Sequence, residues 1–181
     1  TWTTQVTEQS LGGDYYFRNI EFLNESIGFL GTLNSLFLKT VDGGTNWIPV
    51  TNLPTVPEAI CGLDAVGAST IYGCGAYFSP AFIIKSSDSG ETWQHINMSA
   101  YATALVEVMF IDENVGYVAG ANANGGIILK TTDGGVTWTP IFNSGIAGEY
   151  VWKLQALASN SDVIFGSVEA NAPNNGKMIR S

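Results

Sequence analysis

One eight-residue pattern occurs three times along this chain. It spans 40–47 as Thr-Val-Asp-Gly-Gly-Thr-Asn-Trp, and its other copies span 86–93 and 131–138. The tryptophans that end the copies, Trp47, Trp93 and Trp138, are 46 and 45 positions apart. A fixed period of roughly 20–50 residues indicates a repeat architecture, so this pattern constrains the fold more than any other feature. We call it the Asp motif.

A second signature precedes the Asp motif in each repeat. The segments 22–30 and 110–118 both contain an apolar strand, a polar turn, and then a glycine and an aromatic residue that open the next strand. The segments 65–72 and 157–165 keep this pattern loosely. Each repeat is therefore expected to hold four short strands. The 21 glycines and the charged fraction of only 13% fit such strands and their tight turns.

We therefore predict an all-β protein, a β-propeller of four-stranded antiparallel blades. About four repeats are present, with Trp-to-Trp boundaries at 2–47, 47–93, 93–138 and an incomplete 138–181. Trp2 continues the period, so we expect residues 2–6 to form the fourth strand of a blade. Because both ends of the chain fall inside an Asp motif, we expect residues 1–181 to be one segment of a larger propeller of about six to eight blades.

The Asp motif is expected to have a structural role. Its last glycine supplies a positive φ, its carboxylate accepts hydrogen bonds from amides of the turn, and its tryptophan buries a large ring against a blade. A carboxylate repeated in every blade is poorly suited to a single catalytic centre. The predicted structural residues are Asp42, Gly44, Trp47, Asp88, Gly90, Trp93, Asp133, Gly135 and Trp138.

The motif resembles the Asp-box (BNR-like) repeat, Ser/Thr-x-Asp-x-Gly-x-Thr-Trp/Phe, and departs from it once, where Asn46 replaces the usual Thr. With its strand lead-in, the closest resemblance is to the photosystem II assembly and stability factor type of repeat in bacterial secreted proteins. The resemblance implies a propeller and a secreted, periplasmic or cell-surface location. It leaves function open, because Asp boxes also occur in sialidases, xyloglucan-cleaving enzymes and sorting receptors.

Charge and composition exclude several classes of partner. The net charge of -9 repels nucleic acid and anionic lipid surfaces. No apolar run reaches the roughly 18 residues of a membrane helix, so membrane insertion is not expected. No phosphate-binding glycine loop and no metal-ligand spacing occurs, and we predict neither a cofactor nor a metal site.

The two cysteines, Cys61 and Cys74, lie on two predicted strands joined by a short turn near Gly67. They are placed symmetrically about that turn, so they can face each other across a hairpin. A cross-strand disulfide and two buried thiols both remain open.

Candidate binding residues lie in the variable loops. If the strands of a blade run outward from the axis, the Asp motifs share one face of the propeller and the irregular loops share the other. Exposed aromatic and amide side chains on that second face suit a glycan or protein ligand. The predicted binding residues are Tyr77, Phe78, Tyr101, Asn122, Asn124, Tyr150 and Asn174.

An enzymatic alternative rests on two carboxylates. Glu21 and Asp64 occupy the same place on successive innermost strands and could line the funnel, but the third repeat has Met109 there. We predict a non-catalytic secreted or cell-surface binding or scaffold module. The alternatives are a glycoside hydrolase, sialidase- or xyloglucanase-like, with catalytic residues partly outside this segment, and an assembly factor that docks a protein complex.

Overall fold

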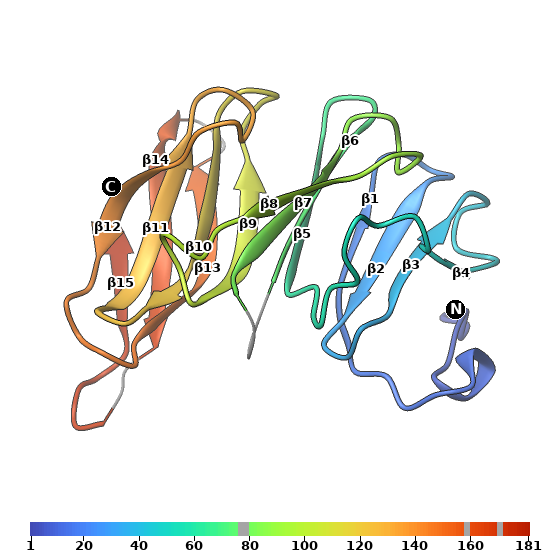
Figure 1. The fold of residues 1–181 in the computed structure, drawn as a ribbon, viewed down its shortest axis with the longest axis horizontal. Coiled ribbons are helices and arrows are strands. Elements are labelled where there is room, and N and C mark those ends of the chain that lie inside the picture. Colours follow the sequence, from blue (N-terminus) through green and yellow to red (C-terminus); the bar gives the residue numbers. More distant parts are fainter. Residues whose placement is uncertain (76–79, 158–159, 170–171) are drawn as a thin grey trace.

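The computed structural model describes residues 1–75, 80–157, 160–169 and 172–181. These residues form four antiparallel sheets that follow one another along the chain (Figure 1). Blade 1 contains β1 (Phe17–Phe22), β2 (Gly28–Thr32), β3 (Phe37–Thr40) and β4 (Ile48–Pro49). Blade 2 contains β5 (Gly62–Val66), β6 (Thr70–Gly75), β7 (Phe82–Ser86) and β8 (Gln94–Asn97). Blade 3 contains β9 (Ala104–Phe110), β10 (Gly116–Asn122), β11 (Gly125–Thr131) and β12 (Thr139–Asn143). Blade 4 contains β13 (Tyr150–Leu157), β14 (Asn160–Glu169) and β15 (Lys177–Arg180).

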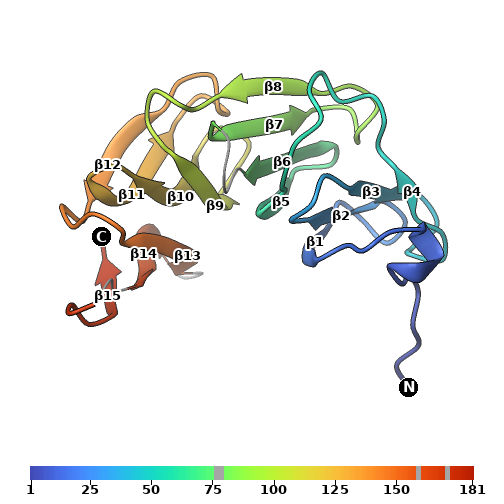
Figure 2. The same ribbon diagram turned by 60° about the horizontal axis from the view of Figure 1, so that its bottom comes forward.

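The blades stand side by side in an arc, with β1, β5, β9 and β13 on its inner side (Figure 2). This arrangement confirms the predicted all-β propeller of antiparallel blades. Blades 1 to 3 have four strands and blade 4 has three. The strand expected over residues 2–6 is wrong, because this segment has no strand structure and Trp2 is fully exposed. The N-terminus lies at the opposite end of the arc from β15, the edge that such a strand would need (Figure 2).

The core lies between successive blades. Trp93 of blade 2 packs edge-on against Phe29 and Phe37 of blade 1, with ring centroids 5.7 and 5.3 Å away. Trp138 of blade 3 is also buried and joins the cluster between blades 2 and 3. Trp47 is only half-buried because no blade precedes blade 1 in the arc. The motif tryptophan therefore joins its own blade to the preceding one.

The three Asp motifs form the same hydrogen-bonded turn. In the third copy, the Thr131 hydroxyl donates to Asp133 Oδ1 at 2.8 Å and accepts the Gly135 N–H at 2.9 Å. Thr137 donates its N–H and its hydroxyl to the two oxygens of the same carboxylate, at 2.9 and 2.6 Å. In the first copy the side chain and backbone of Asn46 make these contacts to Asp42 instead. Asn46 therefore replaces Thr in the hydrogen bonding of the turn.

Glycine is needed at the end of each turn. Gly44, Gly90 and Gly135 have φ values of +88°, +81° and +86°, a conformation that side chains with a Cβ rarely adopt. The hydrogen bonds hold the pKa of Asp88 and of Asp133 down to about 2, the bond from the following Thr hydroxyl contributing most. These contacts give each member of the motif a structural task.

The predicted hairpin around the cysteines forms, with a register one residue away from symmetry. Cys74 lies opposite Gly62, and the Cys61 N–H donates to the Cys74 carbonyl oxygen at 2.7 Å. Both side chains are buried thiols in the structure rather than a disulfide. Burial raises the pKa of the Cys74 thiol well above its ordinary value.

Candidate functional site

The innermost strands of blades 1, 3 and 4 carry an irregularity at the same level. The pairing of β1 with β2 shifts at Arg18, that of β9 with β10 at Val106, and that of β13 with β14 at Trp152. In blade 2 Cys61 holds this place, since both Cys61 and Gly62 lie against Cys74. A β-bulge redirects a side chain and bends its strand. The three bulged residues and Cys61 therefore lie at one level of successive blades, near the axis of the arc.

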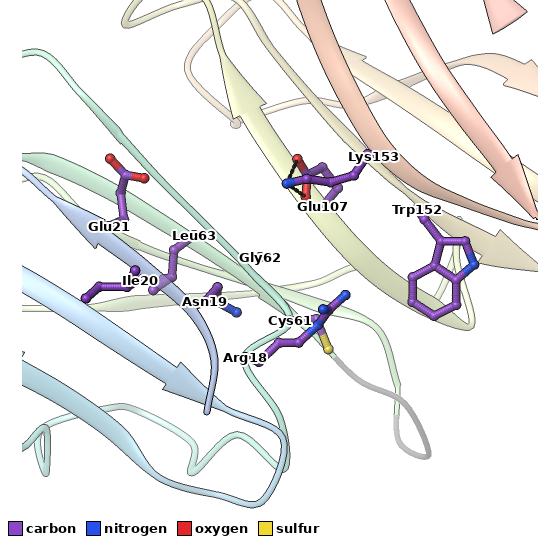
Figure 3. Close-up of a pocket in the computed structure, with 10 residues that line it drawn as sticks. All are labelled: Arg18, Asn19, Ile20, Glu21, Cys61, Gly62, Leu63, Glu107, Trp152 and Lys153. Carbon is purple, nitrogen blue, oxygen red and sulfur yellow. Dashed lines mark hydrogen bonds and ion pairs between the residues drawn. The ribbon is translucent and has the colours of Figure 1, made fainter. Parts of the chain in front are cut away.

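Three of these residues, Arg18, Cys61 and Trp152, line a cavity of about 570 Å³, which we call the funnel cavity (Figure 3). All four blades contribute to its wall. Its lining residues are Arg18, Asn19, Ile20, Glu21, Cys61, Gly62, Leu63, Glu107, Trp152 and Lys153. A smaller hollow of about 260 Å³ adjoins it and shares Arg18, Cys61 and Trp152. The funnel cavity is also larger than three further cavities, which have volumes of about 250, 340 and 300 Å³.

The charges of the funnel cavity differ in how they are paired. Lys153 Nζ lies 2.7 and 2.9 Å from the two carboxylate oxygens of Glu107, which is almost buried. Burial raises the pKa of Glu107, and the hydrogen bond from Lys153 opposes that shift. The Arg18 side chain makes no hydrogen bond or salt bridge with any residue in the described ranges, and its charge lowers the pKa of Glu107 only as a minor contribution. Its guanidinium therefore keeps its donors available to a ligand.

Polar contacts also join each innermost strand to the next. Asn19 Nδ2 donates to the Ile60 carbonyl oxygen at 2.7 Å, the Phe110 N–H donates to Asp64 Oδ2, and Lys153 pairs with Glu107. One such contact therefore stabilises each of the three blade interfaces near the axis.

The two predicted catalytic candidates have different surroundings. Glu21 lines the funnel cavity, and burial raises its pKa. Asp64 does not line the cavity, and its carboxylate is held by the backbone of blade 3. Burial, with smaller contributions from Glu21 and Glu107, raises the pKa of Asp64 to about 7. The geometry thus gives Asp64 a structural task at a blade interface.

The predicted binding residues separate into distinct places. Tyr77 and Phe78 lie outside the described residues. Tyr101 and Asn122 line one cavity on blade 3, and the Asn124 N–H donates to Asn122 Oδ1 at 2.9 Å. Tyr150 stacks on Trp152 beside the funnel cavity, with centroids 5.2 Å apart. Asn174 is exposed in the loop between β14 and β15, and it lines neither the funnel cavity nor the cavity on blade 3.

Sequence reasoning missed Arg18, Glu107, Trp152 and Lys153 as parts of one site. Aligning the repeats on their hairpins does place Glu107 and Lys153 at the same position of successive innermost strands. The bulges, however, have no signature in the sequence, and they decide which neighbouring side chains reach the axis. No group of three or more His, Cys, Asp or Glu side chains suited to a metal ion occurs within the described ranges. In the same part of the chain, no helix is long and apolar enough to cross a membrane.

Comparison with known proteins gives structural relatives only. No protein-family model matches the chain, and no curated protein is similar to it in sequence. A structure of YCF48 bound to D1 peptide matches with a TM-score of 0.66 and 17% identity, over 91% of this chain and 53% of that one. YCF48 from Cyanidioschyzon merolae matches equally well over 56% of its length. The GH74 xyloglucanase from Xanthomonas campestris matches with a TM-score of 0.66 and 15% identity, over 86% of this chain and 26% of that one.

At these identities the similarity concerns the fold alone. The chain spans about half the length of the YCF48 chains it matches. The comparisons and the geometry agree that these residues form antiparallel blades in a propeller arrangement.

Proposed function

We propose that this chain is a binding module that takes a peptide segment of a protein partner in the funnel cavity. The observation that carries the proposal is the unpaired guanidinium of Arg18 in a cavity also lined by Trp152, whose ring stacks on Tyr150. A guanidinium binds carboxylate or carbonyl oxygens, and stacked aromatic rings offer a rigid apolar surface. Peptides present both kinds of group at close spacing.

The shared fold supports this proposal. YCF48, which has the same blade architecture, has been solved with a bound peptide. The funnel cavity is built from all four blades, so it depends on the propeller arrangement and not on one loop. An assembly or scaffold role, in which one protein segment docks on the inner side of the arc, follows from the same chemistry.

Selection from a random peptide library displayed on phage tests the proposal. We expect selected peptides to bind the wild-type chain and to lose at least about tenfold in affinity on Arg18→Ala or Trp152→Ala, the loss of one good anchor. The control is Val136→Ala, because Val136 is exposed within an Asp motif, away from the funnel lining. Failure to select any peptide, or equal binding by all variants, would overturn the proposal.

A glycoside hydrolase is the second candidate. The observation that favours it is the pair of raised carboxyl pKa values at Glu21 and Asp64, together with the fold shared with GH74 enzymes. The placement of Asp64 outside the cavity counts against it. Release of reducing ends from xyloglucan, abolished by Glu21→Gln, would establish hydrolysis. The absence of turnover by the wild-type chain would leave binding as its role.

Two further properties belong to this proposal. The three Asp motifs are of the Asp-box type, which their common hydrogen-bond pattern supports. The protein is secreted, periplasmic or exposed at the cell surface, as is usual for the repeats it resembles. Fractionation of cells that express the native gene tests the location directly.

A further inference from the structure

A separate cavity lies on blade 3, away from the funnel. It has a volume of about 250 Å³ and lies between the loop before β9, the end of β10 and the edge strand β12. Its wall includes Tyr101, Asn122, Pro140, Ile141, Phe142 and Asn143. We call it the rim cavity. It shares no lining residue with the funnel cavity.

The two amide side chains of the rim cavity are held in fixed orientations. Asn122 Oδ1 accepts the Asn124 N–H at 2.9 Å, and Asn143 Oδ1 accepts the Gly145 N–H at 2.8 Å. Because a backbone N–H can bond only to the carbonyl oxygen of an amide, these contacts fix which end is oxygen and which is nitrogen. Each asparagine therefore keeps its NH₂ group for other partners.

Both NH₂ groups can donate further hydrogen bonds. Asn143 Nδ2 donates to Asn122 Oδ1 at 3.3 Å, and Asn122 Nδ2 donates to the Tyr101 carbonyl oxygen at 3.4 Å. Both contacts are longer than the usual 2.7–3.2 Å of protein hydrogen bonds and are correspondingly weak. An amide has two N–H donors, so each group can bond to a ligand oxygen at little cost.

The remaining wall is apolar or aromatic and carries no charge. Tyr101 is 36% exposed and Ile141 is half-exposed, while Pro140 and Phe142 complete the surface. Without a cation, the cavity has nothing to attract an anionic ligand, and the net charge of -9 repels one. The site therefore offers oriented donors next to an aromatic ring in a neutral setting.

From this combination we infer that the rim cavity binds a neutral sugar ring, one unit of an uncharged glycan. The apolar face of a pyranose stacks on an aromatic ring, and its hydroxyl oxygens accept hydrogen bonds from the amide groups. The volume is below the roughly 300–1,000 Å³ of sites for drug-sized ligands, which suits a single ring. An extended peptide fits less well, because the asparagine oxygens that would accept its N–H groups are already bonded within the loops.

A glycan array with neutral, sialylated and sulfated members, followed by calorimetry with the best neutral oligosaccharide, tests the inference. We expect neutral glycans to bind. Tyr101→Ala should remove the stacking surface, and Asn122→Asp should replace a donor by an acceptor while keeping the bond from Asn124. Each is expected to lower the affinity at least tenfold. The matched control is Asn174→Asp, the same change at an exposed amide in another loop of the same kind.

The outcomes separate this site from the funnel. Arg18→Ala should leave glycan binding unchanged, and Tyr101→Ala should leave binding of the selected peptides unchanged. The inference fails if no neutral glycan binds at millimolar concentration, if only charged glycans or peptides bind, or if Asn122→Asp binds as tightly as the wild type. Thermal melting of each variant shows whether a loss of binding reflects a loss of folding.

Discussion

At the scale of single residues, the Asp motif couples stability to acid pH. Asp88 and Asp133 have a pKa of about 2 in the folded chain, against about 3.9 for an unfolded aspartate. A carboxyl group with a lowered pKa stabilises the fold above its unfolded pKa. That stabilisation is present above about pH 4 and is lost as the pH falls through about 2.

We therefore predict that Asp133→Asn lowers the melting temperature at pH 7 and removes part of the loss of stability between pH 4 and pH 2. The amide keeps one oxygen acceptor but turns a donor toward the Thr137 hydroxyl. Melting curves followed by circular dichroism at pH 7, 4 and 2.5 give the comparison. Asp14→Asn serves as the control, because the Asp14 carboxylate accepts no hydrogen bond from a described residue. An acid response identical to that of the wild type would contradict the prediction.

Asp64 should make the stability of the fold depend on pH in the opposite direction. Its folded pKa of about 7 lies above the unfolded value, so the contribution of this group to stability is fully present below about pH 4 and is lost as the pH rises through 7. A shift of about three pKa units corresponds to at most about 4 kcal/mol.

Asp64→Asn should therefore stabilise the chain at pH 8 by about 1–3 kcal/mol and change it little at pH 4.5. The amide oxygen can still accept the Phe110 N–H. Urea unfolding at the two pH values measures the difference. Asp64→Ala, which leaves that N–H without its acceptor, should destabilise the chain at both. If Asp64→Asn is less stable than the wild type at pH 8, the negative charge of Asp64 does not destabilise the fold, and the prediction is wrong.

Single residues also show where sequence reasoning succeeds. The tasks of Asp133, Gly135 and Trp138 follow from local chemistry that repeats every 45 or 46 positions, and the structure contains the turns they were expected to form. Arg18 was not predicted as a binding residue, because the feature that marks it is a guanidinium without a hydrogen-bond or salt-bridge partner among the described residues. The absence of a partner is a property of the whole site and has no local signature.

At the scale of elements, the bulges on the innermost strands set tight limits on the strands beside them. A Cβ placed on Gly120 of β10 would lie 2.0 Å from the Ala104 carbonyl oxygen and 2.9 Å from Leu105 Cα. Both are backbone atoms of β9, so they cannot move without disturbing the pairing. Gly166 on β14 is also in a second strand, but its nearest neighbour is the side chain of Ile179 at 3.1 Å.

We predict that Gly120→Ala costs about 3 kcal/mol of stability, whereas Gly166→Ala costs at most about 1 kcal/mol. The reason is that a flexible side chain can move by a few tenths of an ångström and a paired backbone cannot. The free energy of urea unfolding of the two variants tests this, with unchanged m-values as the check on two-state behaviour. Equal losses would mean that the bulged strand adapts.

The elements themselves were predictable, and their register was not. Alternating apolar residues and turn glycines locate the strands of every repeat. Register depends on which residue of β1, β9 or β13 bulges, and that is decided by packing between blades. The strand expected over 2–6 does not form for a related reason. The sequence of this segment matches the repeat, but no sheet edge is available there for it to pair with.

At the scale of the whole molecule, stability depends on interfaces between neighbouring blades. One cluster lies between blades 1 and 2, a second between blades 2 and 3, and a third between blades 3 and 4. The outer faces of the first and last blades have no such partner in the arc. Ile20 is 55% exposed, while Val108 and Leu154 in the same position of later blades are buried. Met178 is 74% exposed, whereas Ile83 in the same position is fully buried.

Repeat proteins of this kind have a stability close to the sum of their units and nearest-neighbour interfaces. Blades 2 and 3 have two interfaces each, and blades 1 and 4 have one. Native-state hydrogen exchange should therefore be slower in the middle of the arc, because local opening there breaks more contacts.

The second strands β2, β6, β10 and β14 allow a matched comparison. Each is paired on both sides within its own sheet, so an amide in any of the four strands has a neighbouring strand to bond to. We predict that the slowest amides of β6 and β10 exchange at least about tenfold more slowly than those of β2 and β14, a difference of about 1.4 kcal/mol in opening free energy. Exchange measured by mass spectrometry or NMR resolves the four strands. Equal protection would mean that the arc opens as one cooperative unit, and that contacts within blades outweigh those between them.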